Sequence, residues 1–77
     1  MADFTQLHHK RRLVRSLPSP ALRRSIREDA GLTQEDVATA LGVSRAIVSR
    51  WEAGLRRPRG RRLTDYAQLL KELQSDG

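Results

Sequence analysis

The segment TQEDVATALGVSRAIVSRWEAG, residues 33–54, most constrains the fold because two helix-like stretches lie only three residues apart in it. Thr33 followed three residues later by Asp36 is a capping box, which predicts a helix over residues 34–41. A serine in the GVS linker is a good N-cap for a second helix over residues 45–53. So short a connection, beginning with glycine, forces the two helices to cross steeply. The segment therefore predicts a helix-turn-helix.

A further helix is predicted before this segment. Ser19 and Pro20 provide an N-cap and a favourable first helical residue for a helix over residues 20–30. Leu22 and Ile26 share one side of that helix, and we expect them to form its buried stripe. The prolines of SLPSP separate it from any earlier helix, because each disfavours helical backbone in the residue before it.

Two more helical patterns complete the expected architecture. Residues 3–17 carry a capping signal and an apolar side that basic residues interrupt. Residues 61–74 have an inner stripe made of Leu63, Tyr66, Ala67 and Leu70. No segment alternates polar and apolar residues as a strand does. We therefore expect an all-α protein of about five helices, with a basic N-terminal helix or arm over residues 1–18 and a compact domain over residues 19–75.

Positive charge is concentrated in two clusters on either side of a balanced middle. The 77 residues have a formal net charge of +6. Residues 1–18 hold four basic residues and one acid, residues 19–54 hold five arginines and five acids, and residues 55–64 hold five arginines and no acid. Clustered arginine is the electrostatic pattern expected of a protein that binds a polyanion. A solvated basic surface without a partner is the alternative.

Composition and motifs also exclude several classes of protein. The chain has no cysteine, so disulfides and thiolate metal sites are excluded. It has neither an apolar run near the roughly 18 residues of a membrane span nor a signal-peptide pattern, so we expect a cytoplasmic, nucleoid-associated protein. His8 and His9 are adjacent and point in different directions on a helix, so no metal or other cofactor is expected. Without a nucleophile elbow or a glycine-rich phosphate loop, neither catalysis nor a small-molecule ligand is expected.

The predicted helix over residues 45–53 has two distinct faces. Val48 and Trp51 fall together on one face, which we expect in the core, with Ile47 at its edge. The opposite face carries Arg45, Ala46, Ser49 and Arg50. A major groove admits one helix, and arginine pairs bidentately with guanine. The second face therefore predicts a base-reading surface, where small side chains allow the backbone to approach closely. Trp51 is expected to pack in the core rather than to stack on a base.

The same residues resemble a known family. The stretch LTQEDVATALGVSRAIVSRWEAG, with the following RRP and LTDYAQLL, looks like the phage-repressor/Cro-like (XRE) helix-turn-helix domain over about residues 22–73. The resemblance implies a compact lambda-repressor-like fold and a transcriptional regulator that binds double-stranded DNA sequence-specifically. We expect a repressor that binds a pseudo-palindromic operator as a homodimer.

The resemblance also implies roles for single residues. Gln34 matches a glutamine that contacts a phosphate, and Arg27 and Glu52 match an ion pair that ties two helices together. The base-facing positions are Arg45, Ala46, Ser49 and Arg50. Ile47 stands where relatives are often polar, and it either touches a thymine methyl group or packs. The basic loop, residues 55–60, matches the part of the family that lies along the DNA backbone. The expected phosphate-binding residues, some of them in this loop, are Gln34, Ser44, Arg56, Arg57, Arg59, Arg61 and Arg62.

Three questions stay open at the level of sequence. The N-terminal basic residues contact phosphates, reach a minor groove, or decorate a packed helix. Leu69 and Leu73 either complete the core or form a self-association surface with Phe4 or Leu7. The alternative function is a protein-interaction module on the same fold, such as an antitoxin or antirepressor, with secondary DNA binding. The two arginine clusters argue against this alternative.

Overall fold

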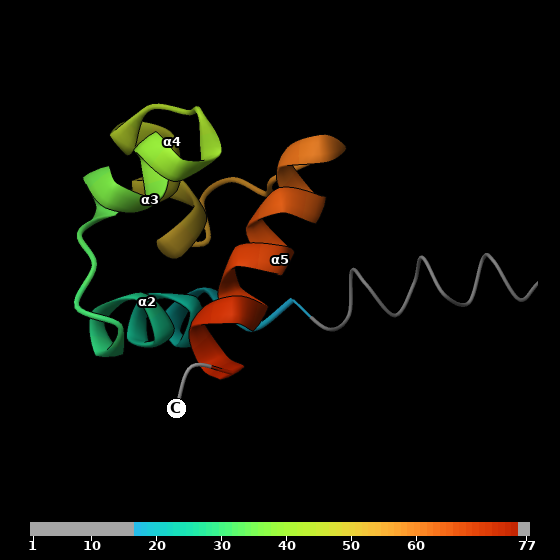
Figure 1. Cartoon of the computed structure of the whole chain (residues 1–77). Coiled ribbons are helices and arrows are strands. Elements are labelled where there is room, and N and C mark those ends of the chain that lie inside the picture. Colours follow the sequence, from blue (N-terminus) through green and yellow to red (C-terminus); the bar gives the residue numbers. More distant parts are fainter. Residues whose placement is uncertain (1–16, 76–77) are drawn as a thin grey trace, which may run out of the picture.

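The computed structural model describes residues 17–75, and this part of the chain contains four helices and no strand (Figure 1). The helices are α2 (Pro20–Asp29), α3 (Gln34–Leu41), α4 (Arg45–Glu52) and α5 (Arg61–Ser75). The predicted all-α architecture is confirmed. Residues 3–16 of the helix expected over residues 3–17, including Phe4, Leu7, His8 and His9, lie outside the described residues, while Leu17 is described and is not helical. The division at residue 18 stays a prediction.

Local capping signals start the first three of these helices. Ser19 and Ser44 each accept the backbone N–H three residues further on, at 3.3 Å. Thr33 and Asp36 form the complete capping box, with N–O distances of 3.0 and 2.8 Å. The structure thereby satisfies N–H groups that a helix start leaves without partners. Hydrogen bonding to Thr33 also lowers the pKa of Asp36 from its ordinary value.

The sharp turn between α3 and α4 depends on Gly42. This residue has a φ of 68°, in the left-handed region that side chains disfavour, and its N–H bonds back to the last turn of α3. Two residues later Ser44 already caps α4. Because the reversal takes only three residues, α3 and α4 cross steeply and pack against each other (Figure 1).

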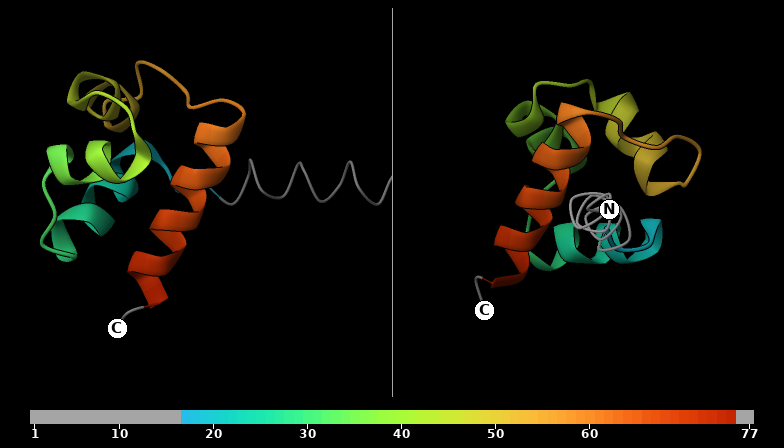
Figure 2. Two further views of the ribbon diagram at one scale, coloured as in Figure 1. Left: turned by 45° about the horizontal axis from the view of Figure 1, so that its top comes forward. Right: turned by 90° about the vertical axis from the view of Figure 1, so that its right-hand side faces the viewer.

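The helices enclose one small core. α4 packs against α2 and α3, and α5 lies alongside α2 and α3 (Figures 1 and 2). The buried apolar residues are Val37, Ala38, Val48, Trp51, Tyr66 and Leu70. The rings of Trp51 and Tyr66 have centroids 4.8 Å apart and tilt by 31°. Such aromatic pairs stabilise by about 0.5–1.5 kcal/mol beyond their burial, and this pair joins α4 to α5.

The prediction that Leu22 forms a buried stripe with Ile26 is wrong. Leu22 is 51% exposed, whereas Ile26 is half-buried and packs against the core. The inner face of α2 instead carries Arg23 and Arg27, which are both buried. Burial of these arginines is possible because buried backbone carbonyl groups and a carboxylate accept their N–H groups.

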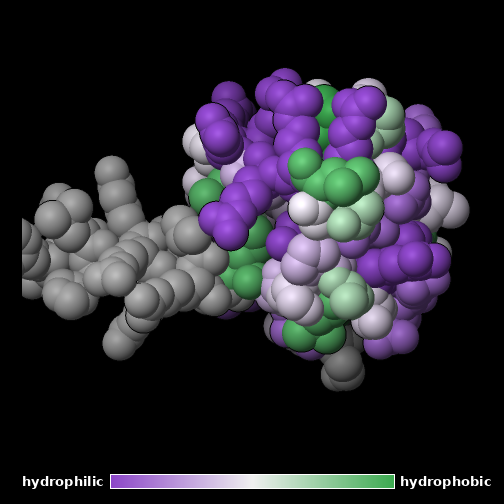
Figure 3. Space-filling view, turned by 180° about the vertical axis from the view of Figure 1, so that it is seen from behind, coloured by the Kyte–Doolittle hydropathy of each residue, from purple (hydrophilic) through white to green (hydrophobic). Residues whose placement is uncertain are grey.

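Helix ends and the outer part of the core differ slightly from the predictions. α2 and α4 each end one residue earlier than predicted, and α5 extends one residue further. In α5, Tyr66 and Leu70 are buried as predicted, while Leu63, Ala67 and Leu73 are half-buried and Leu69 packs against the core. None of the helices in residues 17–75 is long and apolar enough to cross a membrane. Seen from the side opposite to Figure 1, hydrophobic residues form small patches between hydrophilic ones (Figure 3).

Candidate nucleic-acid interface

α4 is held with one face inward and the other outward. Val48 and Trp51 are fully buried on the inner face. On the opposite side, Arg45, Ala46 and Arg50 are exposed and Ser49 is half-buried. The apolar anchor therefore fixes which residues of α4 face the solvent. These include two guanidinium groups with small side chains beside them.

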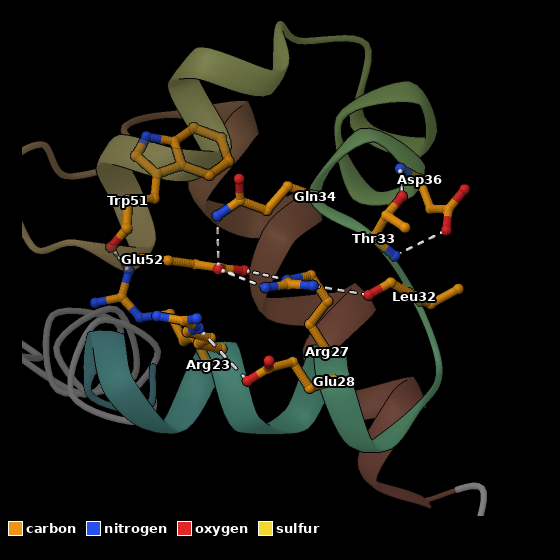
Figure 4. A network of polar contacts seen from close by, with 10 residues as sticks. Arg23, Arg27, Glu28, Leu32, Thr33, Gln34, Asp36, Trp51 and Glu52 are labelled. Carbon is orange, nitrogen blue, oxygen red and sulfur yellow. Dashed lines mark hydrogen bonds and ion pairs between the residues drawn. The ribbon is translucent and has the colours of Figure 1, made fainter.

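The C-terminal end of α4 is fastened by a buried polar network (Figure 4). Arg27 Nε and Nη2 donate to the two carboxylate oxygens of Glu52 at 2.7 and 3.0 Å. Arg27 Nη1 donates to the carbonyl oxygen of Leu32 at 2.8 Å. The hydrogen bond to Glu52 is the main reason why the pKa of Arg27 is raised above its ordinary value. The ion pair implied by the resemblance is thus present and links α2 to α4.

Gln34, the first residue of α3, belongs to the same network. Its Nε2 donates to Glu52 Oε1 at 3.1 Å, so α2, α3 and α4 all meet at this carboxylate. An amide nitrogen carries two N–H groups, and this bond uses one of them. The side chain is half-buried. Gln34 is therefore held in place while part of the residue stays at the surface.

Sequence reasoning missed Arg23, the second buried arginine of α2. Its Nε donates to the carbonyl oxygen of Pro18 at 2.7 Å and its Nη1 to that of Trp51 at 3.4 Å. Its guanidinium carbon lies 5.9 Å from the centroid of the Tyr66 ring. The spacing of four residues from Arg27 places both arginines on one helix face, and this spacing is the signal that could have identified it.

The loop between α4 and α5 and the first turn of α5 together bring five arginines to the surface. Arg56, Arg57 and Arg59 are exposed in the loop, and Arg61 and Arg62 are exposed on the first turn of α5. The buried Pro58 anchors the loop to the body of the protein. The surface hollow at this loop has a volume of about 570 Å³, and its lining is Ile47, Trp51, Leu55, Arg56, Arg57, Pro58, Arg59 and Arg62.

The predicted DNA-contacting residues line three hollows around α4 and the start of α5, apart from Ser44 and the outer-face residues Ala46, Ser49 and Arg50, which line none of them. Gln34 and Arg45 line a shallow hollow at the start of α3, together with acidic residues of α2 and α3. Ile47 lies in the hollow of the basic loop, on the other side of α4. Ser44 caps α4 through its hydroxyl group, as described above. Arg61 contributes to a third hollow and lies 3.6 Å from Asp65 in an exposed pair, whose energetic contribution is small.

The charged side chains around α4 are mostly cationic, with arginines at its outer face and in the hollow of the basic loop. Within the described part of the chain, no three His, Cys, Asp or Glu side chains gather closely enough to hold a metal ion. Exposed arginines lie on the outer face of α4, at positions 45 and 50, and beside Ile47 in the hollow of the basic loop.

Comparison with known protein families identifies a match. A family model described as helix-turn-helix matches residues 24–74, about two thirds of the chain. The matched region runs from α2 through α5 and includes the whole α3–α4 unit with the basic loop. No curated protein and no solved structure matches the chain.

Proposed function

This chain belongs to the phage-repressor/Cro-like (XRE) helix-turn-helix family of DNA-binding regulators, and we propose that it represses transcription by reading an operator with α4. One observation carries this proposal. α4 buries Val48 and Trp51 completely, while Arg45 and Arg50 are exposed on its other side. A helix anchored in this way can enter a major groove with its guanidinium groups facing the base edges.

We assign base reading to the outer face of α4. Arg45 and Arg50 each have the geometry to pair bidentately with guanine, and one such pair gives about 1–3 kcal/mol of discrimination between bases. Ala46 and the half-buried Ser49 are small, which lets the backbone of α4 approach the base edges closely. Ile47 lies at the margin of this face and offers an apolar contact.

The surrounding polar groups position the protein on the DNA backbone. The arginines of the basic loop and of the first turn of α5 bind phosphates on one side of α4. On the other side, Gln34 offers its remaining amide N–H, and the N-cap residue Ser44 lies at the start of α4. Contacts of this kind set the register of the protein without reading sequence.

Binding takes place as a homodimer in this proposal. Two-fold related helix-turn-helix units read half-sites about one helical turn, roughly 34 Å, apart. A single α4 contacts only a few base pairs, so the second copy supplies the specificity that one domain lacks. The operator is therefore pseudo-palindromic.

Selection of bound sites from a random pool of double-stranded DNA, at near-physiological salt, tests the proposal. Enrichment of a pseudo-palindromic motif is the expected result. Such a motif would report both sequence-specific DNA binding and the two-fold symmetry of the bound protein. The matched control is the double variant Arg45→Ala, Arg50→Ala, which keeps the fold because both side chains are exposed. If the wild-type chain enriches no motif, or the double variant enriches the same one, the proposal is wrong.

A further inference from the structure

Leu55 is an unusual residue in the basic loop. It is 80% exposed, and the other large hydrophobic residue exposed in the described part of the chain is Leu22, at 51%. Leu55 follows Gly54 and precedes Arg56 and Arg57, so an apolar side chain stands among cations. No element of the described fold covers it. Covering this side chain, and so removing it from water, is energetically favourable.

The surroundings of Leu55 identify the kind of ligand. It lines the hollow of the basic loop together with Ile47 of α4 and the arginines at positions 56, 57, 59 and 62. No acidic residue lines this hollow, whereas Asp65 lines the hollow beside it and Glu28 and Glu35 line the hollow at the start of α3. The hollow thus combines apolar groups with a wholly cationic rim.

Double-stranded DNA presents the complementary pattern. Along the DNA backbone, anionic phosphates alternate with deoxyribose carbons, and thymine C5-methyl groups line the adjacent major groove. We propose that Leu55, beside Ile47, is a DNA-contacting residue that covers such a carbon group while the flanking arginines bind phosphates. This proposal rests on the DNA-binding function proposed above.

Charge complementarity favours DNA over a protein partner at this hollow. An apolar protein surface that covered Leu55 would also have to desolvate or neutralise the arginines around it. DNA supplies an anion on each side of the carbon group. The position of the hollow next to the exposed face of α4 also places Leu55 where DNA passes when α4 reads a groove.

The variant Leu55→Ser tests the proposal in the full chain, with Leu22→Ser as the matched control. Both leucines are exposed, so neither change is expected to shift thermal unfolding. On the selected operator, Leu55→Ser is expected to raise Kd about tenfold, since a leucine that is largely buried by a ligand contributes on the order of 1.4 kcal/mol. Leu22→Ser is expected to leave Kd unchanged.

The salt dependence distinguishes an apolar contact from a charge contact. Plots of log K against log salt between about 50 and 200 mM are expected to have the same slope for Leu55→Ser and the wild type. Arg57→Ala is expected to reduce that slope. A reduced slope for Leu55→Ser would mean that the variant disturbs the arginines, and the apolar contact would be rejected.

Operators with uracil in place of single thymines identify the carbon group. If Leu55 covers a thymine methyl group, one uracil weakens wild-type binding but has no further effect on Leu55→Ser. If it covers deoxyribose, no uracil position shows this coupling, although Leu55→Ser still weakens binding.

Two results would overturn the inference while leaving the proposed function intact. The first is an operator affinity of Leu55→Ser equal to that of the wild type. The second is a loss of affinity that disappears when dimer concentration is held constant, because Leu55 would then belong to a protein–protein interface. Failure of the wild-type chain to select any operator would instead reject the proposed function, and this inference with it.

Discussion

Arg27 and Glu52, 25 residues apart in the sequence, form a bidentate ion pair with N–O distances of 2.7 and 3.0 Å. Their side chains are only 10% and 3% exposed. The pair joins α2 to the last residue of α4, and Gln34 of α3 donates to the same carboxylate. The orientation of α4 therefore depends on a buried charge pair as well as on apolar packing.

Loss of one partner of this pair is expected to be costly. Arg27→Met leaves a buried carboxylate without its cation, which lowers the free energy of unfolding by about 3–5 kcal/mol. The double variant Arg27→Met, Glu52→Leu is expected to recover at least half of that loss, because apolar side chains often replace a buried pair without net cost. Urea unfolding at pH 7 measures the free energy of unfolding of the single and the double variant. Additive losses in the double variant would show that the two residues are not coupled.

An exposed pair on α2 provides the control for this comparison. Arg24 and Glu28 lie 3.5 Å apart with more than half of each side chain exposed. Arg24→Met is expected to change the free energy of unfolding by no more than about 0.5 kcal/mol, because solvent screens such pairs.

Arg45→Ala is expected to relax base preference at one operator position in each half-site. The physical reason is loss of a bidentate contact that discriminates by about 1–3 kcal/mol. Competition binding with operators altered one base pair at a time measures the preference, and Lys71→Ala, an exposed cation on α5, is the control. An unchanged preference profile for Arg45→Ala would show that α4 reads DNA with other residues.

Arg57→Ala is expected to weaken binding to all DNA sequences by a similar factor. A phosphate contact carries no sequence information, but it releases counterions, so its loss reduces the slope of log K against log salt by about one. Titrations of operator and unrelated DNA over a salt series measure this effect. Selective loss for the operator alone would place Arg57 at a base.

Tyr66 makes stability depend on alkaline pH. Burial raises the pKa of Tyr66 to about 12 from its ordinary 10.0, although the nearby Arg23 cation acts in the opposite direction. Between these pH values the unfolded chain loses the tyrosine proton and the folded chain keeps it, so stability falls as pH rises. Because the chain has one tyrosine, tyrosinate absorbance during alkaline titration reports this group alone. A midpoint near 10 would contradict the prediction.

The Tyr66 hydroxyl group itself is expected to reduce stability at pH 7. It is buried and has no hydrogen-bond partner among the described residues. Tyr66→Phe keeps the ring on Trp51 and removes a desolvated polar group, so the free energy of unfolding is expected to rise by about 1 kcal/mol. Urea unfolding of this variant checks the sign. A clear loss of stability would reveal a partner for the hydroxyl group.

The amino-acid sequence by itself determined the helices of residues 20–75 and the two faces of α4. N-caps such as Ser19 and Thr33, a left-handed residue such as Gly42 and a helical repeat of apolar residues act over three or four positions, so they can be recognised along the chain. The separation of Val48 and Trp51 from Arg45 follows from helix geometry alone. These features therefore appear in the structure where the sequence placed them, to within one residue at the helix ends.

Only the tertiary structure decided which face of α2 is buried and which groups meet around α4. Leu22 is more hydrophobic than Arg23, yet the arginine is buried because carbonyl groups of Pro18 and Trp51 lie within its reach. The hydrogen bond from Gln34 to Glu52 and the exposure of Leu55 likewise depend on distant segments. A buried charge is stabilised by its partners, and their positions are set by the packed fold rather than by neighbouring residues in the chain.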